Sequence, residues 1–325
     1  MRYAAAPPTR RIRPAGGRIG VPRSLCYDEL RLYFDGALAA HGVEIAHAAR
    51  STAATLAAGL ERCVDEVCFP LKVFFGHVAA LAAGGVDTVL VPRLVSLAKG
   101  RNLCPKFHVL PDLVESAFPG LTVLAPYVDL HHSKRAELAA HLADAMRPAL
   151  VELGAFDARS KGRLADAWRA ELARTDAAIP PADAVRVAAI GHLYAERDPF
   201  LGVGVARELV RLGAAVVGSP EVVQASPGAL EEGMYYEPNI RAARAIERRL
   251  AEGADGVVLL TYFACGPDSY AADAIIGRLK ARGVRVPILR LILDEQTSSE
   301  GLVTRLATFV DVARLGRGER GGGRA

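Results

Sequence analysis

The chain has 325 residues, with 40 Lys and Arg against 36 Asp and Glu, so its net charge is +4. Hydrophobic residues make up 51% and charged residues 23%, a globular composition that excludes a disordered, collagen-like or coiled-coil chain. The basic excess lies in the terminal stretches 1–17 and 316–325, so the part between them offers no basic face for nucleic acid. With no membrane-length apolar run and no apolar signal core, we expect a cytoplasmic protein without a membrane helix.

Apolar, strand-like runs alternate with helix-like segments along the chain. The first half is predicted to form strands at 19–22, 43–46, 87–92 and 121–126, and helices at 28–41, 52–62 and 71–83. Residues 133–182 show helical periodicity without a strand pattern. The second half is predicted to form strands at 185–191, 214–219, 256–262 and 286–293, and helices at 200–212, 239–252, 270–282 and 301–313.

This alternation predicts parallel sheets with right-handed crossovers. We expect an α/β protein of two Rossmann-like (flavodoxin-like) parallel-sheet lobes, residues 18–132 and 183–315, joined by a helical segment at 133–182. The site is expected in the inter-lobe cleft, and residues 1–17 and 316–325 are expected to be flexible tails. The lobes open on weakly similar stretches, RIGVPRSLCYDE and RVAAIGHLYAERD, which fits either a repeat or a shared strand–turn–helix pattern.

Three cysteines are expected in loops that follow strands: Cys68 in CFPLK, Cys104 in CPK and Cys265 in CGPDS. Each is followed by a nearby proline, which suits the first turn of a helix. A helix N-terminus stabilises a thiolate, and Cys68 and Cys265 fit that position. If they converge, three thiolates can hold three irons of a [4Fe–4S] cluster. Spacing alone leaves two alternatives open, namely zinc with His77 or His108 as a further ligand, and three simply buried thiols.

Other polar residues are predicted near the same strand ends. Lys72 and His77 follow Cys68 on its side of a helix and are candidate catalytic groups, with core packing as the alternative for His77. The candidates for lining the cleft are Arg23, Cys26, His192, Tyr194 and Asp268. For Asp268 we favour capping of the next helix, and for Asp294 and Glu295 an ion pair that fixes their loop.

Six stretches occur in a characteristic order: IGVPRSL, EVCFPLKVFFGHV, DTVLVPR, LCPKFHVLPDL, YFACGPDSY and LDEQTSSEGLVTRLATF. As a set they resemble the 2-hydroxyacyl-CoA dehydratase component family. The resemblance is closest to the branch of acyl-CoA dehydratase activase-related proteins, known largely as a domain of unknown function. It covers about residues 18–313.

The resemblance implies a [4Fe–4S] cluster, for which Cys68, Cys104 and Cys265 match the three ligand positions. With three thiolates, the fourth iron would be open, or bound by Cys26 or Cys63. In the dehydratases, an ATP-hydrolysing activator supplies one low-potential electron, the thioester carbonyl of a 2-hydroxyacyl-CoA becomes a ketyl radical anion, and the hydroxyl group leaves.

For this chain the resemblance therefore implies either a dehydratase-like lyase or a low-potential reductase or electron-transfer component. Its implied partners are an ATP-dependent activase and a second dehydratase-type subunit or a second copy of the chain, with an acyl-CoA as substrate. The sequence has no P-loop, so the ATP-driven electron must come from another protein. The alternative is a zinc-stabilised or metal-free module of Rossmann type that binds an acyl-CoA or a nucleotide without redox chemistry.

Overall fold

The computed structural model describes residues 18–39, 42–132, 144–146, 184–219 and 228–322. The expected N-terminal tail, and the expected helical segment apart from residues 144–146, lie outside this part of the chain. Two compact units are distinguished, unit 1 from Met1–Ala49, Ala57–Cys63 and Phe74–Arg174, and unit 2 from Arg50–Leu56, Val64–Val73 and Thr175–Ala325. Two short segments of the N-terminal half thus belong to unit 2, and the expected domain limits stay a prediction.

Unit 1 contains a four-stranded parallel sheet in the order β2-β1-β3-β5. Its strands are β1 (Arg18–Val21), β2 (Glu44–His47), β3 (Thr88–Leu90) and β5 (Thr122–Leu124). The helices of the N-terminal half are α1 (Tyr27–Ala39), α2 (Ala53–Leu60), α3 (Phe69–Ala83) and α4 (Pro105–Ala117). Two further strands, β4 (Arg93–Ser96) and β6 (Tyr127–Asp129), form a small parallel sheet.

All four strands predicted for this half are present, whereas β4, β6 and α4 were not predicted. β4 and β6 are only four and three residues long, too short for an alternating pattern to stand out. Helix α4 contains Pro111, a residue that normally signals the end of a helix.

Unit 2 contains a second four-stranded parallel sheet, in the order β10-β9-β7-β8. Its strands are β7 (Val185–Ile190), β8 (Ala214–Val217), β9 (Gly256–Tyr262) and β10 (Ile288–Leu293). Its helices are α7 (Leu193–Arg197), α8 (Val205–Arg211), α9 (Glu237–Ala251), α10 (Gly266–Ala281) and α11 (Ser299–Gly322), with a 3₁₀ turn, η3, at Ala229–Glu231.

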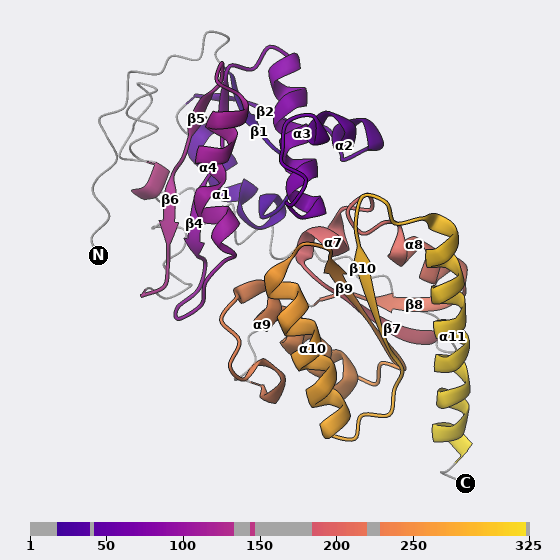
Figure 1. Ribbon diagram of the computed structural model, residues 1–325. Coiled ribbons are helices and arrows are strands. Elements are labelled where there is room, and N and C mark those ends of the chain that lie inside the picture. The colour runs from indigo at the N-terminus through magenta and orange to yellow at the C-terminus, as the bar shows by residue number, and fades with distance from the viewer. Residues whose placement is uncertain (1–17, 40–41, 133–143, 147–183, 220–227, 323–325) are drawn as a thin grey trace. The chain divides into compact units, whose positions relative to one another are not determined.

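Helices cover both faces of the unit 2 sheet (Figure 1). Helices α9 and α10 lie side by side over one face, while α8 and α11 pack on each other at the other face. Apolar side chains of β7, β9, α9 and α10 form a common core that includes Ile190, Ile246, Leu259 and Ile275. Every residue of β9 is buried, as expected for an inner strand of a parallel sheet. The prediction of an α/β fold with parallel sheets is confirmed.

The two sheets have the same strand order, β2-β1-β3-β5 in unit 1 and β8-β7-β9-β10 in unit 2. Strands β1, β2, β3 and β5 of unit 1 then correspond to β7, β8, β9 and β10 of unit 2. The two similar sequence openings are therefore the first strand and first helix of equivalent sheets. In each unit the first strand is an inner strand, the second strand pairs on one side of it, and the third pairs on the other side. The strand order therefore reverses between β1 and β3, and between β7 and β9, and a ligand-binding crevice is expected at the carboxyl ends of these strands.

Two helices of unit 2 differ from their predicted extent. Val203 and Gly204 adopt left-handed backbone conformations, with φ of 48° and 67°, so α8 begins only at Val205. Helix α11 continues through residues 316–322, which were expected to be part of a flexible tail. Its end is held by Arg317, whose guanidinium donates a hydrogen bond to the carbonyl of Ala184 (2.6 Å). Of the helices described, none has the length and apolar character needed to cross a lipid bilayer.

Candidate functional site

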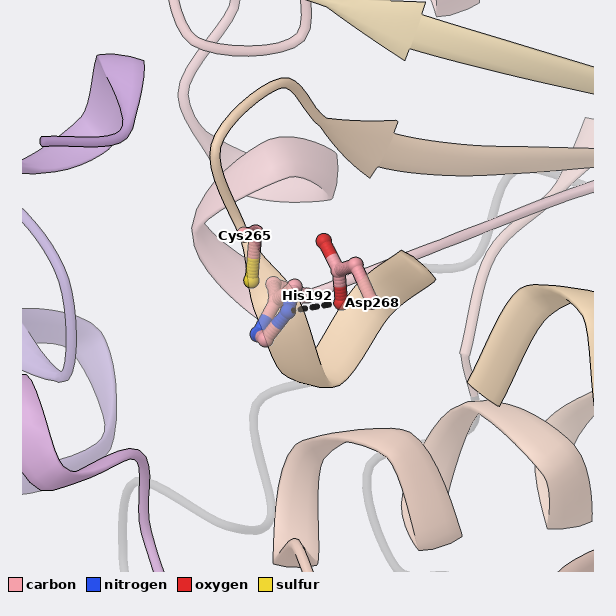
Figure 2. A group of neighbouring side chains, drawn as sticks. All are labelled: His192, Cys265 and Asp268. Atoms are coloured by element: carbon pink, nitrogen blue, oxygen red, sulfur yellow. Dashed lines mark hydrogen bonds and ion pairs between the residues drawn. The ribbon is translucent and has the colours of Figure 1, made fainter. Parts of the chain in front are cut away.

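The carboxyl ends of β7 and β9 bring together His192, Cys265 and Asp268 in unit 2 (Figure 2). His192 follows β7 and is the N-cap of α7, while Cys265 follows β9 and is the N-cap of α10. One potential ligand atom of each side chain lies within 4.8 Å of the others, and all three residues are buried. This group stands at the crevice that the strand order predicts for a ligand.

Asp268 is a buried carboxylate held by three hydrogen bonds. Its Oδ1 lies 2.6 Å from His192 Nε2 and accepts a bond from Asn239 Nδ2 (3.0 Å), and its Oδ2 accepts the backbone N–H of Tyr262 (3.1 Å). Burial alone would raise the pKa of Asp268, but the charge of His192 and these hydrogen bonds together lower that pKa below its ordinary value. Asp268 is therefore ionised, and the expectation that it caps α10 is wrong because its oxygens bind these other groups.

Cys68 lies at the start of α3 and belongs to unit 2. Its carbonyl accepts the backbone N–H groups of Leu71 and Lys72, as an N-cap residue does. The next side chain, Phe69, packs its ring at 5.8 Å from that of Phe200 and 6.1 Å from that of Tyr262.

An ion pair also fixes this segment, because the ammonium of Lys72 contacts a carboxylate oxygen of Glu295, in the loop after β10. Lys72 is only 4% exposed, so Glu295 compensates a buried charge. The sequence predicted a pinning role for Glu295 but not its partner.

Two buried tyrosines, Tyr194 and Tyr262, belong to the same part of unit 2 as Cys68 and Cys265. Burial raises the pKa of Tyr194 and of Tyr262 well above the ordinary value, and Asp268 raises both further. Cys265 and Cys68 each add to the rise for both tyrosines. The geometry agrees: the backbone N–H of Cys265 donates to the carbonyl of Tyr262 (3.2 Å), Phe69, next to Cys68, packs 6.1 Å from the ring of Tyr262, and the two tyrosine rings are 5.7 Å apart. Two cysteines far apart in the sequence thus come to one place in unit 2.

Cys104 and Cys26 belong to unit 1. Cys104 is the N-cap of α4, and its carbonyl accepts the backbone N–H of Phe107 (2.9 Å). Cys26 directly precedes α1, and its carbonyl accepts the N–H of Leu30 (3.1 Å). With Cys68 and Cys265, four of the five cysteines stand at a helix N-terminus, the position that favours a thiolate.

Cys26 lines a small apolar cavity at the carboxyl ends of β1 and β3, together with Tyr27 and Phe107. Its volume of about 40 Å³ is far below the roughly 150 Å³ that accommodates a benzene ring, so it does not hold an acyl chain as it stands. Arg23, another predicted cleft residue, lies 5.7 Å above the ring of Tyr27.

The remaining predicted residues lie elsewhere. His77 is 1% exposed on α3, in unit 1. Cys63 is half-buried just after α2 and donates its backbone N–H to the carbonyl of Gly59. His108, weighed as a zinc ligand, packs edge-on against Tyr127 at 6.3 Å.

Sequence reasoning missed three members of the site, namely Asn239, Tyr262 and Phe69. Each has a signal that is clear only in retrospect. Asn239 lies in the first turn of α9, Tyr262 ends an otherwise aliphatic strand, and Phe69 directly follows a loop cysteine. None of these signals shows which residues are in contact in the folded chain.

Comparison with known proteins places the chain in a family. The model of the CoA enzyme activase uncharacterised domain matches residues 18–221, more than half of the chain. This match includes Cys68, Cys104 and His192 and ends before Cys265. It agrees with the expected resemblance to activase-related proteins.

No curated protein matches the chain. Among solved structures, a match is found to the glycosyltransferase SnogD from Streptomyces nogalater, with 11% identity, 94% of this chain and 98% of that chain covered, and a TM-score of 0.19. So low a score does not establish a shared fold. The chain belongs to the family of the CoA enzyme activase uncharacterised domain.

Proposed function

We propose that this chain is an iron–sulfur protein that holds a [4Fe–4S] cluster for low-potential one-electron chemistry, with an ATP-dependent activase as its electron donor. The observation that carries the proposal is that Cys68 and Cys265, far apart in the sequence, both belong to unit 2 and both adjoin Tyr262: Cys265 donates its backbone N–H to the Tyr262 carbonyl (3.2 Å), and Phe69, next to Cys68, packs 6.1 Å from its ring. Neither cysteine forms a disulfide.

The donor set fits such a cluster. Fe–S clusters are held by thiolates, and both cysteines lie at helix N-termini, where backbone N–H groups and the helix dipole stabilise negative charge. We assign the third thiolate to Cys104, because it has the same N-cap position and lies in the LCPK stretch of the family resemblance.

The surrounding residues favour a protected redox centre. Tyr194 and Tyr262 are almost fully buried and remain protonated, so they shield the thiols from water without adding charge. Phe69 and Lys72 fix the Cys68 segment through ring packing and the ion pair with Glu295. When bound, the cluster would supply one electron at low potential.

The name of the family supports the proposed partner and substrate. Its name refers to the activase of a CoA enzyme, and the sequence contains no P-loop, so the proposal assigns ATP hydrolysis to a separate activase. The substrate would be an acyl-CoA. The reaction would be dehydration through a ketyl radical or a related reduction, with a second dehydratase-type subunit or a second copy of the chain.

A specific observation supports a second candidate, a zinc site without redox chemistry. Cys265, His192 and Asp268 present ligand atoms within 4.8 Å of one another, which suits a single ion. Zinc accepts thiolate, imidazole and carboxylate ligands. In this case the chain would be a stabilised binding module, and Cys68 would be a further ligand.

Anaerobic reconstitution with iron and sulfide tests the proposal. Wild type is expected to develop broad visible absorption, and the triple variant Cys68→Ser, Cys104→Ser, Cys265→Ser is expected to lose it. Cys63→Ser is the matched control, because it removes a half-buried thiol outside the helix N-termini. A wild type that stays colourless, or a triple variant that retains the absorption, would overturn the proposal.

A further inference from the structure

The imidazole of His192 has a carboxylate and a thiol as neighbours. Its Nε2 is 2.6 Å from Asp268 Oδ1, and Cys265 belongs to the same group of ligand atoms within 4.8 Å. Figure 2 shows the ring next to both groups, with a dashed line to the carboxylate of Asp268 and the sulfur of Cys265 close by. The three side chains come from the ends of two adjacent strands, β7 and β9.

The hydrogen bonds of Asp268 determine which ring nitrogen carries the proton. Both carboxylate oxygens of Asp268 act as acceptors, Oδ1 for the amide N–H of Asn239 and Oδ2 for the backbone N–H of Tyr262. With the oxygens of Asp268 acting as acceptors, Nε2 of His192 donates its N–H to Oδ1. In the neutral imidazole the lone pair is then on Nδ1.

The orientation of the ring is fixed from a second direction. Tyr194 stacks on His192 with ring centroids 4.8 Å apart and an interplanar angle of 15°. His192 is 7% exposed and Tyr194 is 8% exposed, so neither ring has room to turn. A buried imidazole with one nitrogen bound to a carboxylate and a fixed plane has the outer-shell arrangement of histidines that ligate metals.

We propose that His192, through Nδ1, is a protein ligand of the metal centre that Cys265 binds, with Asp268 as the positioning residue. This inference rests on the proposed function and completes its ligand set. With Cys68, Cys104 and Cys265, His192 would give every iron of the cluster a protein ligand. Such a centre would transfer electrons, with no iron left for a substrate oxygen.

Isotope labelling tests the inference without any mutation. The reconstituted and reduced chain, prepared with ¹⁴N-histidine and with ¹⁵N-histidine, is compared by pulsed EPR. We expect an imidazole nitrogen coupling that changes with the isotope. A cluster that forms but shows no such coupling would overturn the inference and leave the proposed function standing, whereas a chain without any cluster would overturn both.

Variants assign the signal to one residue. His192→Cys is expected to keep the cluster and lose the nitrogen coupling, while His132→Gln, at an exposed histidine of unit 1, is expected to keep both. Asp268→Asn is expected to retain the coupling in altered form and to bind iron about 10–100-fold more weakly. A coupling that survives in His192→Cys would contradict the assignment.

Discussion

Replacing Asp268 by asparagine is expected to destabilise unit 2 strongly even without metal. The side chain is 3% exposed and forms hydrogen bonds with His192, Asn239 and the backbone of Tyr262. A hydrogen bond to a charged group contributes about 1.5–3 kcal/mol and one between neutral groups about 0.5–1.5 kcal/mol. Asn has the shape of Asp but no charge. Its amide NH₂ group is itself a donor and would face one of the N–H donors that now bind a carboxylate oxygen.

The expected loss is therefore about 3–5 kcal/mol, comparable to breaking a buried ion pair and a large share of a typical folding free energy of about 5–15 kcal/mol. Asp273→Asn on the same helix is the matched control. Asp273 is paired with Arg290 but its side chain is 78% exposed, so we expect a loss of about 0–1 kcal/mol.

Urea unfolding of the chelator-treated chain, followed by far-ultraviolet circular dichroism, measures both variants. The midpoint for Asp268→Asn is expected to fall by at least about 1 M urea, given the usual slope of about 1–3 kcal/mol per molar urea. If Asp268→Asn were no more destabilising than Asp273→Asn, the view of Asp268 as a buried, ionised organiser of the site would be wrong.

Further predictions concern the Cys68 segment and two glycines. Glu295→Gln should cost about 3–5 kcal/mol because it leaves the buried Lys72 ammonium unpaired, whereas Lys72→Met should cost less because Glu295 is 22% exposed; equal losses in urea unfolding would contradict this. Gly191→Ala should cost about 1–3 kcal/mol, since the added Cβ would lie 2.8 Å from Leu260 Cβ, and Gly277→Ala on exposed helix should stabilise by about 0.5–1 kcal/mol. The melting temperature should fall for Gly191→Ala and rise for Gly277→Ala, and shifts in the same direction would refute these two predictions.

Local sequence patterns predicted much of the fold. Strands β7 and β9 are apolar runs bounded by turn residues, and the helix starts after Cys68 and Cys265 are indicated by proline. These features depend on neighbouring residues, so one sequence suffices. Strands β4 and β6 and the short α7 escaped notice because they are too short to show a period.

The assembly of the site was less accessible, because it depends on contacts between distant residues. His192 and Asp268 were both recognised as residues at strand ends, but their hydrogen bond follows from the pairing of β7 with β9. Phe69 packs on Tyr262, although the two residues are far apart in the sequence and no local pattern connects them. Local sequence favours capping by Asp268, but its carboxylate binds His192, which is distant in the sequence.

The placement of the 64–73 segment in unit 2 has a clear physical basis. It depends on the apolar contacts of Phe69 and on the compensation of the buried Lys72 charge by Glu295. Both are side-chain contacts with residues far along the chain. A chain cut before β7 would leave Phe69 and Lys72 without these partners, so the conformation of the Cys68 segment depends on the C-terminal half.

The most direct test of the central claim is iron, acid-labile sulfide and zinc analysis of the chain purified without oxygen, beside its Cys68→Ser and Cys265→Ser variants. We predict about four iron and four sulfide per wild-type chain, the composition of the cluster that this ligand type holds, and a marked loss of both in each variant. Zinc in place of iron, or no metal at all, would contradict the claim that Cys68 and Cys265 hold a redox cluster.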